Sequence, residues 1–246
     1  MPRTSQQTVI FDLDDTLIHC NKYFVDVLGR FVRLMKEWFP DIPEREIKDK
    51  QSEFDLAGVH AHGLIKERFP QSLAEVYDYF SHRTGRRIRT IERDRLIRLG
   101  YEVYEHKIEP YPGMHETLIR LEKDGYRLGL FTGGDVEVQM NKVHQLNLER
   151  YFGDRIFITS HKNTAAFQRM LERLDSRPED TWMVGNSPRT DIIPALESGA
   201  HAIYIPSELE WAYNQVEIDV ESGGALIRLS RVAEVPDAIR EYSAKS

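Results

Sequence analysis

The sequence has few of the features that would place it outside ordinary globular proteins. It contains one cysteine, Cys20, in 246 residues, which excludes an internal disulfide and fits a reducing compartment. No stretch reaches the ~18 consecutive apolar residues that a membrane-spanning helix needs. The opening MPRTSQQ lacks the apolar core of a signal peptide. We therefore expect a cytoplasmic protein that does not act at a membrane.

Positive charge is also scarce. The chain carries 33 Lys and Arg against 40 Asp and Glu, a formal net charge of −7, which argues against nucleic acid as a partner. One segment departs from this balance, because residues 82–99 hold seven arginines and only two acidic residues. A solvent-exposed helix face is the favoured interpretation of this segment, and a local platform for an anionic ligand is the alternative. Neither charge nor composition indicates an oligomeric state.

Short apolar runs rich in β-forming residues recur along the chain. They span residues 8–12, 126–132, 155–160, 181–186 and 201–206. From the second run onward they alternate with helical patterns, which is typical of βαβ units. Residues 225–230 and 236–242 suggest one more strand and a closing helix. The sequence therefore predicts an α/β fold, a Rossmann-like parallel sheet with helices on both faces.

The first gap between predicted strands is far longer than a crossover between neighbouring parallel strands requires. An amphipathic helix is predicted within it from apolar side chains at i, i+3, i+4, i+7 spacing: Phe24, Val27, Leu28, Phe31, Met35 and Trp38. Pro43 is placed to start another helix. We therefore predict two domains, a core of residues 1–18 and 110–246 and an inserted helical domain of residues 19–109.

Polar side chains follow four of the predicted strands at the point where each strand ends. They are Asp12 and Asp14, then Thr132, then Lys162, then Asn186 and Asp191. Ligands of open parallel α/β sheets bind beyond the carboxyl ends of the strands. Carboxylate, amide and hydroxyl oxygens beside an ammonium suit a phosphoryl group and a divalent cation, and Mg²⁺ prefers hard oxygen ligands. A calcium loop is excluded, because Leu17 and Tyr23 stand where it needs Gly and Glu.

The stretches FDLDDTL, LFTGG, HKN and VGNSPRTDIIPALESGA together resemble the four motifs of the haloacid dehalogenase-like hydrolase superfamily. The resemblance covers residues 1–18 and 110–246, and it is most specific at the first and fourth motifs. The insert at 19–109 falls where this family places its C1 cap. The resemblance implies a Mg²⁺-dependent phosphatase that acts on a small phosphorylated metabolite through an aspartyl-phosphate, with a helical cap that closes over the substrate.

The resemblance also implies a role for one or two residues in each of the first three motifs. Asp12 would be the nucleophile, and Asp14 would be the general acid and then the general base. Thr132 and the backbone N–H of Gly133 would hold the phosphoryl oxygens. Lys162 would neutralise charge on the nucleophile and on the transferring group.

The third motif departs from the family pattern. Its lysine is usually followed by proline, whereas Lys162 is followed by Asn163. Lys142, inside the preceding predicted helix, is the competing lysine. Its position points less directly to the strand ends, so we favour Lys162.

The fourth motif carries the predicted metal site and a second departure. Mg²⁺ would lie between Asp12, the main-chain carbonyl of Asp14 and the loop of Asn186 and Asp191, with the choice between the last two left open. The motif usually begins Gly-Asp, but here Asn186 brings a neutral amide, so metal affinity is expected to be lower. Asn at this place keeps a metal-independent 2-haloacid dehalogenase open as an alternative, although Asp14 favours the phosphatase. A non-catalytic phosphate-binding regulatory module is the alternative from another class, although such modules usually carry no inserted cap.

Overall fold

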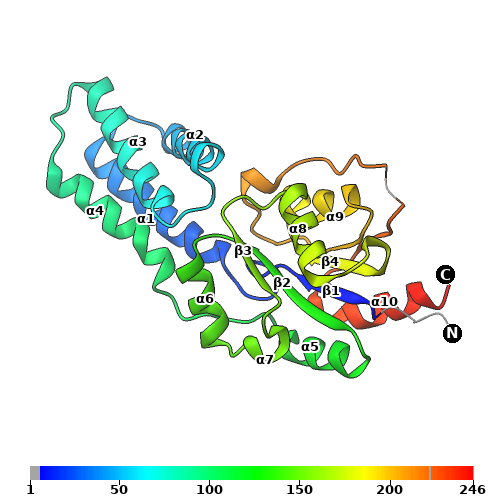
Figure 1. Cartoon of the computed structure of the whole chain (residues 1–246). Helices are drawn as coiled ribbons and strands as arrows, with labels where there is room; N and C mark the ends of the chain where they lie inside the picture. Colours follow the sequence, from blue (N-terminus) through cyan, green and yellow to red (C-terminus); the bar gives the residue numbers. More distant parts are fainter. Residues whose placement is uncertain (1–5, 222, 246) are drawn as a thin grey trace. The chain divides into compact units, whose positions relative to one another are not determined.

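The chain divides into two compact units in the computed structural model, which describes residues 6–221 and 223–245 (Figure 1). The first unit joins Met1–Cys20 to Ile108–Ser246, and the second unit is Asn21–Lys107. Each unit has a hydrophobic core of its own. Within the described residues no helix combines the length and the apolar character that crossing a bilayer requires.

The first unit is built on a six-stranded parallel sheet. Its strands are β1 (Thr8–Phe11), β2 (Arg127–Gly133), β3 (Ile156–Thr159), β4 (Thr181–Gly185), β5 (His201–Tyr204) and β6 (Leu226–Arg228). They lie in the order β3-β2-β1-β4-β5-β6, and β1 pairs with β2 on one side and β4 on the other. The predicted α/β parallel sheet is confirmed. The strand order reverses direction at β1, and such reversal points are where open α/β sheets bind ligands.

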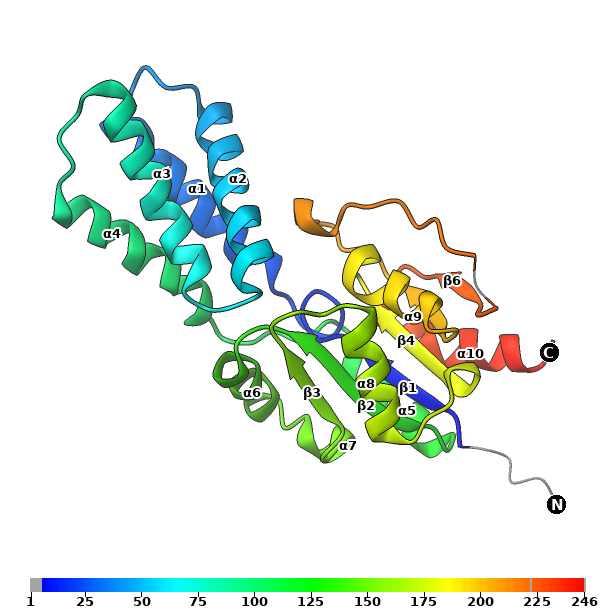
Figure 2. The same cartoon turned by 45° about the horizontal axis from the view of Figure 1, so that its top comes forward.

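Helices cover both faces of this sheet (Figure 2). One face carries α5 (Met114–Lys123), α6 (Val136–Gln145), α7 (Glu149–Phe152) and α10 (Val235–Ser243), and the other carries α8 (Thr164–Leu174) and α9 (Ile193–Glu197). Along β1, Val9 and Phe11 pack on the face that carries α5, α6, α7 and α10, and Ile10 packs on the face that carries α8 and α9. Because both faces are buried, the strand is a continuous apolar run rather than an alternating one.

Two side-chain caps fix where helices begin beside the strand ends. Asp135 directly precedes α6, and its carboxylate accepts hydrogen bonds from the backbone N–H of Glu137 at 3.0 Å and of Val138 at 3.2 Å. Asn163 does the same for α8 by accepting from the backbone N–H of Ala166 at 3.0 Å. The start of α6 determines which of its side chains face the end of β2.

The second unit is entirely helical. It contains α1 (Asn21–Trp38), α2 (Glu44–His62), α3 (Arg68–Thr84) and α4 (Thr90–Tyr101), followed by the short 3₁₀ helix η1 (Glu102–Tyr104). The predicted apolar spacing of α1 is confirmed, since Val27, Phe31 and Met35 are fully buried in the core of this unit. Pro43 directly precedes α2.

The arginine-rich segment 82–99 spans the end of α3 and most of α4, and ion pairs within the second unit engage many of its arginines. These pairs are Arg83 with Glu46, Arg86 with Glu92, Arg89 with Glu92, and Arg93 with Asp78. The hydroxyl of the fully buried Tyr77 donates to Glu92 at 2.6 Å and accepts from Arg86 at 3.0 Å. Most arginines of the segment are exposed, and these ion pairs already balance much of their charge. The structure therefore favours the solvent-exposed helix face over the platform for an anionic ligand.

Candidate active site

The structure brings the predicted site residues together at the carboxyl ends of four strands. Asp12 and Asp14 follow β1, Thr132 and Gly133 end β2, Lys162 follows β3, and Asn186 and Asp191 follow β4. All of them except Asp14 and Gly133 are buried. These positions lie at one edge of the sheet, because the carboxyl ends of parallel strands point the same way.

Lys162 is the central cation of this cluster. Its Nζ lies 2.5 Å from Asp12 Oδ1 and 2.6 Å from Asp191 Oδ1, and the three side chains are 3%, 8% and 0% exposed. Burial raises the pKa of Asp12 to about 7, with the Lys162 ammonium opposing that rise and the Asp191 carboxylate adding to it. Burial by itself lowers the pKa of Lys162, but Asp12 and Asp191 outweigh it and raise that pKa above its ordinary value. Lys162 therefore places a positive charge between Asp12 and Asp191.

Thr16 links Asp12 to Asn186 and has no predicted role. Its Oγ1 is within hydrogen-bonding distance of Asp12 Oδ2, at 3.0 Å, and of Asn186 Oδ1, at 3.4 Å. Thr16 is 2% exposed. Three hard oxygens from the segments after β1 and β4 therefore lie close together. The available signal was the position of Thr16 inside FDLDDTL, four residues after Asp12.

Asp191 uses both carboxylate oxygens inside the protein. Oδ1 faces Lys162, and Oδ2 accepts the backbone N–H of Ser187 at 2.9 Å. A Cβ at Gly185 would come within 2.2 Å of Asp191 Oδ2, so glycine is required at position 185 for the Asp191 carboxylate to lie there. Asp191 thus anchors the loop after β4 to Lys162.

Two residues of α6 hold Asp14. Lys142 Nζ lies 2.7 Å from Asp14 Oδ1 and 2.8 Å from Oδ2. Gln139 Nε2 donates to Asp14 Oδ2 at 3.0 Å and to Thr132 Oγ1 at 2.5 Å. Burial opposes the charge of Lys142, but Asp14 outweighs it and raises the pKa of Lys142 above its ordinary value. Lys142 and Lys162 are therefore not competitors for one position, because each binds its own aspartate.

The turn after Asp14 is held by Asp15. Asp15 adopts a left-handed backbone, with φ of 59°. Its backbone N–H donates to the carbonyl of Ile18 at 2.7 Å, and its Oδ1 accepts the backbone N–H of Cys20 at 3.0 Å.

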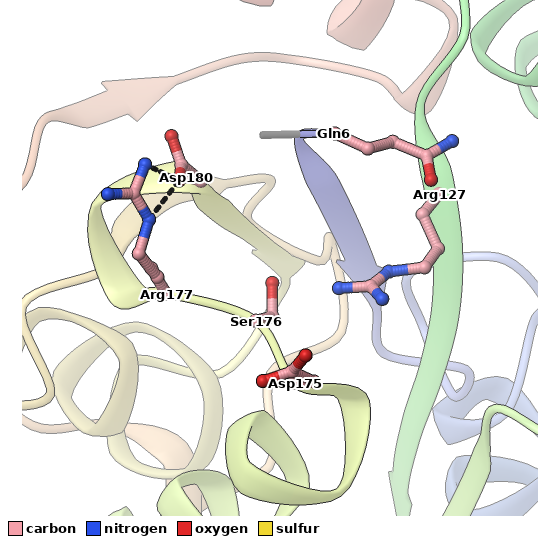
Figure 3. Close-up of a pocket in the computed structure, with 6 residues that line it drawn as sticks. All are labelled: Gln6, Arg127, Asp175, Ser176, Arg177 and Asp180. Atoms are coloured by element: carbon pink, nitrogen blue, oxygen red, sulfur yellow. Dashed lines mark hydrogen bonds and ion pairs between the residues drawn. The ribbon is translucent and has the colours of Figure 1, made fainter. Parts of the chain in front are cut away.

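A small pocket lies apart from this cluster, at the amino ends of the strands. Figure 3 shows its lining residues, Gln6, Arg127, Asp175, Ser176, Arg177 and Asp180. Arg127 and Ser176 donate to Thr8 Oγ1 at 3.0 Å and 2.8 Å, and Arg177 pairs with Asp180 at 2.5 Å. The contacts of Arg127 and Ser176 with Thr8 fix the start of β1, and the pocket contains no predicted site residue.

Comparison with known proteins defines the family. A family model described as haloacid dehalogenase-like hydrolase matches residues 6–199, so the chain belongs to this hydrolase family. The predicted family and the predicted enzyme class, a hydrolase, are confirmed.

Individual relatives agree with this assignment. The chain is 28% identical over 213 residues to a glyceraldehyde 3-phosphate phosphatase from Methanothermobacter thermautotrophicus. This match covers 82% of the chain and 87% of the relative. It is 23% identical over 205 residues to pyrophosphatase PpaX from Bacillus mycoides, covering 80% and 82%. A haloacid dehalogenase-like family hydrolase from Xanthomonas campestris has the same fold, with a TM-score of 0.81 at 24% identity, covering 100% of this chain and 96% of that structure.

Proposed function

We propose that this hydrolase is a Mg²⁺-dependent phosphatase that acts on a small phosphorylated metabolite through an aspartyl-phosphate on Asp12. The observation that carries the proposal is the pair of carboxylates after β1, each held by its own lysine. Asp12 lies against Lys162, and Asp14 lies against Lys142. Two separately held carboxylates suit two different tasks, nucleophile and proton carrier.

In the first half of the proposed reaction, an Asp12 oxygen attacks phosphorus while the bond from phosphorus to the leaving oxygen breaks. Asp14 donates a proton to the leaving oxygen, so a neutral alcohol departs. In the second half, Asp14 takes a proton from water, the water oxygen bonds to phosphorus, and the bond from phosphorus to Asp12 breaks. Inorganic phosphate leaves, and both aspartates return to their starting states.

Thr132, Gly133 and Lys162 bind the phosphoryl group in this proposal. Thr132 is fully buried, and Gln139 orients its hydroxyl. Gly133 presents a backbone N–H at the end of β2 without a side chain in the way. Lys162 supplies positive charge beside the attacking Asp12, which lowers the cost of bringing an anion to a carboxylate.

The donor set after β1 and β4 fits Mg²⁺. Asp12 Oδ2 and Asn186 Oδ1 converge on Thr16 Oγ1, and the main-chain carbonyl of Asp14 is the further candidate ligand. The described residues contain no group of three His, Cys, Asp or Glu side chains arranged for a metal, but Mg²⁺ needs only one or two carboxylates and keeps several waters. Because Asp191 is already bound by Lys162 and Ser187, Asn186 is the favoured ligand. Bound Mg²⁺ would supply charge that lowers the pKa of Asp12 and neutralises phosphoryl oxygens.

The second unit, residues 21–107, is proposed as the C1-type cap, with specificity for the substrate. Two relatives of the whole chain are named glyceraldehyde 3-phosphate phosphatase and pyrophosphatase. A triose phosphate and inorganic pyrophosphate therefore come first among the substrates to test.

The test measures phosphate release by purified protein from p-nitrophenyl phosphate and from a panel of phosphorylated metabolites, with Mg²⁺ and with EDTA. We expect release that requires Mg²⁺ and is absent in Asp12→Asn. Halide release from a 2-haloacid in EDTA, without phosphate release in Mg²⁺, would instead establish the dehalogenase. Asp14 argues against that result, because dehalogenases of this family are not expected to have an acid two residues after the nucleophile.

A further inference from the structure

Two side chains outside the four motifs contact the proton carrier of the proposed reaction. Lys142 Nζ lies within 2.8 Å of both Asp14 oxygens, and Gln139 Nε2 lies 3.0 Å from one of them. The Asp14 side chain is 25% exposed, so without partners its carboxylate is free to turn toward water. Three contacts from two side chains restrict that rotation.

The placement of Lys142 and Gln139 follows from how α6 begins. Asp135 caps the helix directly after β2, and residues three positions apart on a helix share one face. Both side chains therefore face the strand ends. Gly134, with φ of 144°, helps to make room, because a Cβ there would come within 3.1 Å of the Gln139 side chain.

We propose that Lys142 and Gln139 are positioning residues that hold the Asp14 carboxylate where the leaving-group oxygen departs. This inference rests on the proposed phosphatase function. Gln139 also donates to Thr132 Oγ1 at 2.5 Å, so one amide ties the proton carrier to the hydroxyl that binds the phosphoryl group. The distance between these two groups is thereby set by a single side chain that is 1% exposed.

The chemical consequence concerns the step in which the leaving group departs. As Asp14 passes its proton to the leaving oxygen, negative charge develops on its carboxylate. The Lys142 ammonium lies beside that charge. Alkyl phosphates release a strongly basic alkoxide and need this proton, whereas aryl phosphates release a weakly basic phenolate and need it far less.

The experiment compares kcat/KM for two substrates, because this ratio reports the first half of the reaction for each. The substrates are p-nitrophenyl phosphate and the alkyl phosphate that the wild-type chain hydrolyses fastest. The variants are Lys142→Met, which keeps the length of the side chain and removes its charge, and Lys142→Arg, which restores the charge. Lys123→Met is the matched control, since Lys123 is an exposed lysine on α5.

We expect Lys142→Met to lower kcat/KM for the alkyl phosphate by about a hundredfold and for the aryl phosphate by about tenfold or less. Lys142→Arg should recover most of the loss, and Lys123→Met should match the wild type. Equal losses on both substrates, or no loss, would overturn the inference and leave the phosphatase function standing.

Gln139→Met keeps the test decisive if Lys142→Met does not fold. It removes both amide contacts at similar volume, and the inference predicts the same larger loss on the alkyl phosphate. If the folded wild-type chain releases phosphate from neither substrate, the proposed function fails, and this inference fails with it.

Discussion

Replacing Lys162 should expose how much the cluster after β1 depends on one buried cation. Lys162→Met keeps a side chain of similar length and removes the ammonium that lies 2.5 Å from Asp12 and 2.6 Å from Asp191. At an effective dielectric constant of about 20, unit charges at 2.6 Å attract by about 6 kcal/mol before desolvation is subtracted. Removing one partner of a buried ion pair costs about 3–5 kcal/mol. We expect a loss of that size in the free energy of unfolding.

A double-mutant cycle separates lost charge pairing from lost packing. Asp191→Asn removes one of the two carboxylates that Lys162→Met leaves without a counterion. The double variant should therefore be less destabilised than the sum of the two single variants, by about 2 kcal/mol. The measurement is urea unfolding followed by circular dichroism in EDTA, with Lys123→Met as the lysine-deletion control.

The pH dependence gives the cycle an independent check. Burial already raises the pKa of Asp12 from 3.8 to about 7, and removing Lys162 takes away the charge that opposes this rise. A carboxyl whose folded pKa lies above its unfolded value loses stability as pH rises between the two. The deficit of Lys162→Met should therefore be larger at about pH 8 than at about pH 5. Strict additivity in the cycle, together with a deficit that does not change with pH, would show that Lys162 does not stabilise the cluster through its charge.

Three further predictions concern Asn186, His201 and Tyr77. Asn186→Asp adds a negative charge to the proposed metal site. The Mg²⁺ concentration that gives half-maximal activity should therefore fall about tenfold, equivalent to ~1.4 kcal/mol. If that concentration is unchanged, Asn186 is not a metal ligand. Burial lowers the pKa of His201 below 6.5, and its neutral Nδ1 accepts the backbone N–H of Ala225 at 2.9 Å. The stabilising effect of His201 should thus be full above about pH 6.5 and decline at lower pH. The urea midpoints of the wild type and of His201→Gln should therefore converge as the pH falls. A difference between the two midpoints that does not change with pH would contradict this. Tyr77→Phe removes a hydroxyl that donates to the buried Glu92 at 2.6 Å. This change should lower the free energy of unfolding, measured in urea, by about 1–3 kcal/mol. An unchanged free energy of unfolding would show that water replaces the hydroxyl.

The strands and the site positions after them could be predicted from the sequence because both depend on short-range pattern. A strand buried on both faces is a continuous apolar run, and the direction of a parallel sheet then gathers the residues that follow each strand. Asp12, Thr132 and Asn186 were found in this way.

Contacts that depend on the rotation of a helix could not be found from pattern alone. The sequence favours Lys162 over Lys142 as the site lysine, because Lys142 lies inside a helix and outside the third motif. The available signal was the combination of the Asp135 cap with Gln139 and Lys142 three residues apart, which puts both side chains on the face toward Asp14. A search limited to motifs does not detect such a pair.

The arginine-rich segment illustrates a second limit. Its charge count suggested excess positive charge, but two of its acidic partners lie outside the segment, Glu46 on α2 and Asp78 on α3. Local charge balance is therefore a poor guide where helices of one bundle pair across sequence distance.

Trapping the covalent intermediate tests whether Asp12 is the nucleophile. Wild-type, Asp12→Asn and Asp14→Asn chains are mixed with substrate and Mg²⁺, quenched in acid within the first turnover, and analysed by intact mass and peptide mapping. We expect one added phosphoryl group on Asp12, increased in Asp14→Asn because Asp14 no longer activates water, and absent in Asp12→Asn. Turnover with no phosphoryl group on any aspartate, or an Asp12→Asn chain that still releases phosphate, would contradict it.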